Sequence, residues 1–186
     1  MERKRLYILC GCLFPLMVCS GVVYSMFSLF LTETLNIEKS QIGLIYMTGS
    51  AVGFVFAPTL GKLADKFGRK VVIISSMASF VVVFLLYAFV QNYQVMFGIQ
   101  ALEGVSWVAI GASANAYVAD IAPYEKRGWA LGIYQRIVSL GWIAGPAIGG
   151  FLFEIVGFRI AFLFGGIVVC VSIVPALILL KESKVT

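Results

Sequence analysis

Two ionisable residues lie inside long runs of apolar residues, Glu103 in the run 94–119 and Arg136 in the run 128–153. Runs of this length can cross a membrane, where an ionisable side chain is costly and usually has a function. A carboxyl group in low-dielectric surroundings favours its neutral form, which suits a site that binds and releases a proton. Two structural roles remain open as alternatives: Glu103 protonated and bonded to a neighbouring helix, and Arg136 extended toward the lipid headgroups.

The composition of the 186-residue chain requires a lipid environment. The chain is 61% hydrophobic and only 12% charged, whereas about 25% of the residues in a soluble domain are charged. A soluble domain of this size leaves too much surface in water to bury so many apolar side chains. The net charge of +5 does not predict a nucleic-acid partner, because the basic residues sit in short connections instead of forming one basic face.

Six apolar runs are long enough to form membrane-spanning helices, which need about 20 residues each. They cover approximately residues 6–31, 41–60, 71–90, 94–119, 128–153 and 158–180. The sequence therefore predicts an all-α membrane protein, with one six-helix transmembrane domain over residues 1–186 and no soluble domain. The first run is long and lacks a clear cleavage site, so we expect a retained helix instead of a signal peptide.

Lysine and arginine residues predict the orientation of these helices, because cytoplasmic loops retain them. One set of connections, together with both termini, carries eleven of them: Arg3, Lys4, Arg5, Lys62, Lys66, Arg69, Lys70, Lys126, Arg127, Lys181 and Lys184. The other connections carry only Lys39 and Arg159, and Arg136 lies within the fifth run. We expect a multi-pass protein of the cell membrane with both termini in the cytoplasm.

This orientation places Glu103 and Arg136 at different depths in the membrane. At the helical rise of 1.5 Å per residue, Glu103 lies about 25 Å from the cytoplasmic end of its helix, and Arg136 about 12 Å from that end of its own helix. The difference of roughly 13 Å exceeds the reach of the two side chains. We therefore expect water or a third residue, and not a direct bond, to connect them.

The connection "GKLADKFGRK", residues 61–70, contains more than the basic residues that topology requires. Asp65 and Arg69 are four residues apart, so on a helical turn they face the same way and can pair. Gly61 and Gly68 suggest close backbone approach or unusual dihedral angles. Carboxylates contribute little to membrane topology, so Asp65 indicates a further role for this loop.

Small residues in the fifth run predict close packing against another helix. Gly141, Gly145 and Gly149 recur at a spacing of four and share one helix face, and Gly132 precedes them. Pro146 removes a backbone donor and favours a kink. In a lone six-helix unit, we expect this glycine face to be exposed and to need a partner.

Two of these segments resemble signatures of the major facilitator superfamily. Residues 61–70 resemble its loop signature between the second and third helices, and "LGIYQRIVSLGWIAGPAIGG" resembles the antiporter signature of its fifth helix. The second resemblance rests on Gly132, Gly141, Gly145, Pro146, Gly149 and Gly150. It implies a six-helix bundle equivalent to the amino-terminal half of a twelve-helix secondary transporter, closest in its motifs to the drug/proton antiporters.

The resemblance also implies a cytoplasmic gate. In that family the loop, with its glycines, helps to hold the gate shut against an acid at the cytoplasmic end of the fourth helix, where this chain has Asp120. Arg127, just before the fifth run, resembles the matching loop of drug-efflux members. The implied gate is a cluster of Asp65, Arg69, Asp120 and Arg127. The alternative is a set of solvated loop charges, each pair contributing under about 1 kcal/mol.

The fourth run departs from the family pattern. The family signature has an arginine, two residues and then Gln-Gly, whereas this chain reads Gln100-Ala101-Leu102-Glu103-Gly104. The arginine tied to proton coupling is therefore replaced, and an acid stands three residues later. The family fold places the first and fourth helices along the central cavity, so the polar residues of these runs and Arg136 indicate a substrate or proton pathway. The pathway candidates are Tyr24, Ser28, Gln100, Glu103, Trp107, Asn115 and Arg136, with ordinary packing as the alternative for Trp107.

These observations predict secondary active transport of a small solute by alternating access, with proton-coupled efflux or antiport as the mode of coupling. The implied partners are the lipid bilayer, a small-molecule substrate, protons and a second six-helix half, supplied by a longer chain or by a homodimer. The alternative is a non-transporting membrane scaffold or an inactive truncated fragment. We expect no enzyme, cofactor or metal site, because the chain has no His, nucleophile elbow or phosphate loop. Without a His, the pair Cys10 and Cys12 is a weak basis for a metal site.

Overall fold

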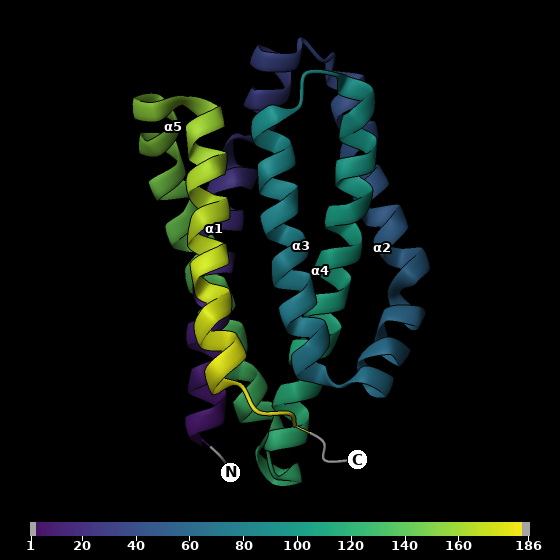
Figure 1. The fold of residues 1–186 in the computed structure, drawn as a ribbon, viewed down its shortest axis with the longest axis vertical. Coiled ribbons are helices and arrows are strands. Elements are labelled where there is room, and N and C mark those ends of the chain that lie inside the picture. The colour runs from purple at the N-terminus through teal and green to yellow at the C-terminus, as the bar shows by residue number, and fades with distance from the viewer. Residues whose placement is uncertain (1–2, 184–186) are drawn as a thin grey trace.

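The computed structural model describes residues 3–183. Its helices are α1 (Arg3–Leu35), α2 (Lys39–Phe67), α3 (Arg69–Phe89), α4 (Tyr93–Ile121), the short η1 (Tyr124–Lys126) and α5 (Arg127–Leu179). The long helices run roughly side by side along the longest axis of the molecule (Figure 1). All five are long and apolar enough to cross a membrane. The fold class predicted from the sequence, a helical membrane protein, is confirmed.

Gly157 divides α5 into two arms. Its φ of 75° and ψ of 170° are not helical, and a positive φ is accessible to glycine because it has no Cβ. The chain reverses here, so the first arm (residues 127–156) and the second arm (158–179) run in opposite directions (Figure 1). The chain therefore forms a bundle of six membrane-length segments. The break lies at Gly157, and the backbone around Pro146 keeps helical dihedral angles.

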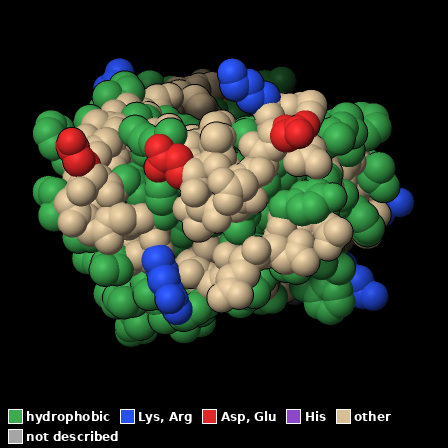
Figure 2. Space-filling view, turned by 90° about the horizontal axis from the view of Figure 1, so that it is seen from above, with side chains coloured by type: hydrophobic (Ala, Val, Ile, Leu, Met, Phe, Trp, Pro, Cys, Tyr) green, Lys and Arg blue, Asp and Glu red, His purple; other side chains and the backbone are tan. Residues whose placement is uncertain are grey.

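The two described ends of the chain lie at the same end of the bundle, here called the terminus end (Figure 1). The connections between α2 and α3 and between α4 and α5 lie there as well. The remaining connections lie at the opposite end, where carboxylates and a few Lys and Arg side chains are scattered among uncharged ones (Figure 2). Lys184, one of the basic residues in the orientation argument, lies outside the described residues.

Glycines allow two pairs of helices to approach at backbone distance. A Cβ added at Gly145 would lie 2.6 Å from the Cα of Gly21, so the first arm of α5 packs directly on α1. A Cβ added at Gly104 would lie 2.9 Å from the Cα of Gly49, so α4 packs equally closely on α2. Small residues at such crossings bring helices close enough for extensive van der Waals contact in a membrane. These contacts set the positions of α1, α2 and α4 around the site described below.

The glycine face of the fifth run has its partner inside the bundle. Gly141, Gly145 and Gly149 are buried against α1, where added Cβ atoms would meet Met17, Val18 and Val22. The expectation that this face is exposed in a lone six-helix unit is therefore wrong. Two members of the motif lie apart from the close contact. Gly132 is exposed, with no heavy atom within 4 Å of an added Cβ, and Gly150 has only the end of the Met26 side chain, at 3.9 Å.

Candidate functional site

Arg69 joins three helices at the terminus end. It is the first residue of α3, and only 4% of it is exposed. Its Nη2 lies 2.5 Å from Oδ1 of Asp65 on the last turn of α2. Its Nε lies 3.4 Å from Oδ2 of Asp120 near the end of α4. An exposed ion pair contributes little, but removing a partner from a buried charge is costly. Arg69 therefore contributes more here than a solvated loop charge would.

Glu182 completes this cluster from a part of the chain that sequence reasoning did not connect to the loop. Its carboxylate accepts hydrogen bonds from the backbone N–H of Arg69, at 2.7 Å, and of Lys70, at 3.2 Å. These are first-turn N–H groups of α3, which lack partners within the helix, and a carboxylate there also interacts favourably with the helix dipole. The segment that follows α5 is thereby tied to the start of α3.

Gly68 is required at this contact for two reasons. Its φ of 99° is strained for any residue with a Cβ, and an added Cβ would collide with the Glu182 carboxylate. Gly61 differs from expectation, because an added Cβ would meet no heavy atom within 4 Å and its φ is not positive. Close approach in this loop is thus a property of the second glycine alone.

Ser183 extends the cluster to Asp120, whose Oδ2 accepts a hydrogen bond of 2.9 Å from the serine hydroxyl. Nearby, Lys70 donates from Nζ to the carbonyl of Leu177 at 2.8 Å, and Tyr117 donates to the carbonyl of Lys181 at 2.9 Å. The segment after α5 is therefore bound to backbone N–H groups of α3 and to side chains of α4, and the Lys70 side chain of α3 binds the last turns of α5. We call Asp65, Arg69, Asp120, Glu182 and Ser183 the ionic cluster.

Arg127 does not join the ionic cluster, which corrects the expected four-residue gate. Its Nε donates to the carbonyl of Ala119 at 3.0 Å, and its guanidinium lies 5.6 Å from the ring centroid of Tyr124. It therefore secures the end of α4, whose last carbonyl groups have no partner within the helix. It forms no ion pair with Asp65 or Asp120 among residues 3–183.

Glu103 forms the centre of a buried polar group within the bundle. It is 1% exposed, and its Oε2 accepts hydrogen bonds from the Tyr87 hydroxyl, at 2.5 Å, and from Nε2 of Gln100, at 3.1 Å. Nε2 of Gln100 also donates to the Tyr87 hydroxyl at 2.9 Å. The second carboxyl oxygen, Oε1, is buried and meets no donor at hydrogen-bonding geometry. No described cation pairs with this carboxyl.

Tyr87 was not among the sequence candidates. It ends an apolar run in α3, and an aromatic residue at that position is common at a membrane interface. Only the pairing of α3 with α4 shows that its hydroxyl faces Glu103. Arg136, by contrast, is exposed on the first arm of α5, and Asn115 is exposed on α4. These two pathway candidates therefore lie away from the buried polar group.

An aromatic pocket of about 310 Å³ lies beside Glu103, between α1, α2 and α4. Its walls include Tyr24, Tyr46, Gln100 and Trp107. Tyr24 and Trp107 also approach the Glu103 carboxyl from this side. Ser28, the remaining candidate on α1, forms a hydrogen bond of 3.2 Å with the Tyr46 hydroxyl at the edge of this group. Three aromatic side chains with a few polar groups and glycines form its walls, and apolar and aromatic walls with a few polar groups are typical of small-molecule sites.

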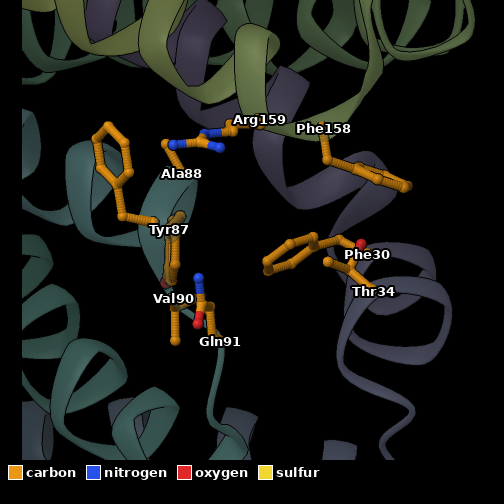
Figure 3. Close-up of a pocket in the computed structure, with 9 residues that line it drawn as sticks. Phe30, Thr34, Tyr87, Ala88, Val90, Gln91, Phe158 and Arg159 are labelled. Carbon is orange, nitrogen blue, oxygen red and sulfur yellow. The ribbon is translucent and has the colours of Figure 1, made fainter.

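A second pocket, of about 320 Å³, lies toward the opposite end of the bundle, where α1, α3 and the second arm of α5 meet. Tyr87, Phe30, Phe158 and Arg159 line it (Figure 3). The Arg159 guanidinium lies 4.7 Å from the ring centroid of Phe89. Because the Tyr87 ring lines this pocket while its hydroxyl bonds Glu103, the buried carboxyl lies between two pockets.

A six-segment helical bundle with a buried carboxyl, an adjacent aromatic pocket and an ionic cluster at one end has the organisation of a membrane-transporter domain. The family model of the Major Facilitator Superfamily matches residues 9–186. The chain belongs to this superfamily, which is a family of transporters and not of enzymes.

Relatives and a solved structure agree with this assignment. The chain is 26% identical over 182 residues to the quinolone resistance protein NorA of Staphylococcus aureus, covering 98% of this chain and 46% of the relative. It is 28% identical over 183 residues to multidrug resistance protein 2 of Bacillus subtilis, covering 98% and 45%. The crystal structure of the human organic anion transporter MFSD10 (TETRAN) superposes with a TM-score of 0.79 at 16% identity, covering 100% of this chain and 49% of that one. The chain thus spans about half the length of these proteins.

Proposed function

We propose that this chain forms the amino-terminal half of a proton-coupled exporter, in which the aromatic pocket contacts a small apolar or aromatic solute and Glu103 carries the proton. The second half comes from a longer chain or from a second copy. The observation that carries the proposal is the placement of Glu103: buried, without a cationic partner among the described residues, and next to the pocket. A buried carboxyl without a counter-ion favours the proton-bound form and can release the proton when its surroundings change.

The proposal includes the orientation in the membrane. The terminus end carries most of the described Lys and Arg residues, so it faces the cytoplasm by the rule that cytoplasmic loops retain positive charge. The ionic cluster then lies on the cytoplasmic side. Alternating access is a rocking of two halves about a central site, and the cluster would stabilise one of the two states by holding α2, α3 and α4 together.

Two relatives support efflux as the direction of transport, since they are a quinolone resistance protein and a multidrug resistance protein. Their names describe those proteins, and for this chain they only favour an aromatic, drug-like solute as a first test compound. The aromatic pocket is consistent with such a solute, because ring stacking and apolar contact recognise a class of molecules more than one compound.

Glu103→Gln tests the proton role. The open reading frame that contains this chain, including any continuation after residue 186, is expressed and reconstituted into vesicles. Export of a fluorescent aromatic cation is then measured with and without a proton gradient across the vesicle membrane. Glutamine is nearly isosteric and still accepts from Tyr87, so folding should survive. We expect the variant to lose the dependence of export on the proton gradient. The ratio of the export rate with the gradient to the rate without it should fall by at least about tenfold.

Glu154→Gln is the matched control, because Glu154 is an exposed carboxylate in the first arm of α5, away from the pocket. It should leave proton-driven export unchanged. If Glu103→Gln retains full gradient dependence, protons are carried elsewhere and the assigned role is wrong. If the unaltered protein shows no flux for any tested solute with or without a second half, the scaffold alternative is favoured instead.

A further inference from the structure

A basic pocket of about 540 Å³ lies at the terminus end, between the start of α1 and the end of the second arm of α5. Among the described residues, seven line it: Arg3, Lys4, Arg5, Ile8, Ile178, Leu179 and Lys181. It shares no lining residue with the aromatic pocket, and it adjoins the ionic cluster only through Lys181, the chain neighbour of Glu182. Neither the transport proposal nor the relatives assign it a role.

The charge of this pocket is strongly positive. Of the seven lining residues within 3–183, four are basic and none is acidic. Among the described residues, the carboxylate next to Lys181 in the chain is that of Glu182, and it is directed instead to the first N–H groups of α3. The Arg3 guanidinium lies 5.8 Å from the ring centroid of Trp129, a contact that leaves its charge in place. The pocket also adjoins the N-terminus of α1, whose first backbone N–H groups favour anions.

Apolar surface begins at the rim of the same pocket. Ile178 is 73% exposed and Leu179 is 50% exposed on the second arm of α5, and Tyr7 is 55% exposed on α1. These side chains belong to membrane-spanning helices, so they contact acyl chains when the bundle is in a bilayer. A tyrosine at this level is typical of the headgroup region. The pocket therefore combines basic side chains suited to an anion with a surface for hydrocarbon.

We propose that this pocket binds the headgroup of an anionic phospholipid, with the phosphate between the basic side chains and the acyl chains along the exposed face formed by Ile178 and Leu179. Basic pockets between transmembrane helices are suited to anionic headgroups, and clustered Lys and Arg at a helix end attract such lipids. A free phosphate shares the headgroup chemistry but does not use the apolar rim. The lipid is therefore the occupant that accounts for both halves of the site.

Lipid binding to the whole chain, purified in a neutral detergent, tests the proposal. Native mass spectrometry is used to titrate phosphatidylglycerol and, separately, zwitterionic phosphatidylcholine. The test variant is Lys4→Gln with Lys181→Gln. Each Lys or Arg near an anionic lipid surface contributes about fivefold in binding, so the double variant should bind phosphatidylglycerol roughly 30-fold more weakly. The unaltered protein should bind phosphatidylcholine weakly.

Lys62→Gln with Lys126→Gln is the matched control, because it removes two exposed lysines of the same end that do not line the pocket. It should retain nearly full binding, and so should Lys4→Arg with Lys181→Arg, which keeps the charge. Equal losses in the test and control variants would overturn the proposal, since attraction would then be unspecific. Complete displacement of phosphatidylglycerol by inorganic phosphate at equal concentration would also overturn it, by assigning the pocket to free phosphate.

Discussion

Gly145→Ala should destabilise the bundle although alanine is the better helix former. The added Cβ would lie 2.6 Å from the Cα and 2.7 Å from the carbonyl carbon of Gly21, and 2.7 Å from the carbonyl oxygen of Val18. Non-bonded carbon atoms prefer about 3.5–4.0 Å, so α1 and the first arm of α5 would have to separate by roughly 1 Å. All three neighbouring atoms belong to the backbone, so no side-chain rotation can relieve the contact.

The magnitude follows from two opposing effects. Overpacking of this kind costs about 1–3 kcal/mol, and replacing glycine by alanine in a helix returns up to about 1 kcal/mol. The net loss of about 1–2 kcal/mol should lower the melting temperature by about 2–8 °C for a chain of this size. Thermal unfolding of the purified protein in detergent, followed by thiol reactivity of the buried cysteines Cys10, Cys12 and Cys19, measures the change.

Gly132→Ala provides the matched control, because it lies on the same arm with no heavy atom within 4 Å of the new Cβ. It should leave the melting temperature unchanged or raise it slightly. If Gly145→Ala and Gly132→Ala have the same melting temperature, the glycine contact with α1 does not limit packing, and the assignment of this face to an internal helix interface is refuted.

Three further variants test the ionic cluster and the buried polar group. Asp120→Asn removes the charge of a partner of the buried Arg69 and should lower the free energy of unfolding by about 1–3 kcal/mol. The control Glu125→Gln, at an exposed position, should leave the free energy of unfolding unchanged. Equal effects of the two variants would contradict the role of Asp120. Glu182→Gln removes the charge at the first turn of α3 and should cost about 0.5–2 kcal/mol, seen as faster hydrogen exchange in residues 69–72; unchanged exchange there would refute the capping contact. Tyr87→Phe removes a hydrogen-bond donor to Glu103 and should lower the free energy of unfolding in detergent by about 1–3 kcal/mol. The control Tyr93→Phe, at an exposed position, should leave the free energy of unfolding unchanged. Equal free energies of unfolding for the two variants would refute the role of the Tyr87 hydroxyl.

The helical membrane class could be read from the sequence, because it depends on properties that add along the chain. A segment inserts into the bilayer core as a helix when about 20 consecutive residues are predominantly apolar, and runs of that length are visible in the sequence. The pair of Asp65 and Arg69 was also predicted, because their spacing of four places them close together on a helical turn. In the structure they pair across the junction of α2 and α3 at Gly68, so the contact was predicted but its helical geometry was not.

The contacts that build the site were decided by the tertiary structure. Glu182 is 113 residues from Arg69 in the chain, and Tyr87 is 16 residues from Glu103 on another helix, so no local periodicity connects either pair. The partner of Gly145 could not be read from its spacing, because a small face is compatible with any helix that approaches it. Arg127 is the opposite case, because the expected partners were carboxylates in other segments and the actual partner is local. Its guanidinium donates to the backbone carbonyl of Ala119, eight residues earlier in the chain.

The sequence by itself thus determined that the chain is embedded in lipid, which segments form helices, and which ionisable residues lie inside the membrane. Which of these residues meet was decided only when α1, α3, α4 and the two arms of α5 packed together. The physical reason is that membrane insertion depends on sums over consecutive residues, whereas hydrogen bonds and close glycine contacts depend on distances of a few ångströms between helices that are remote in the chain.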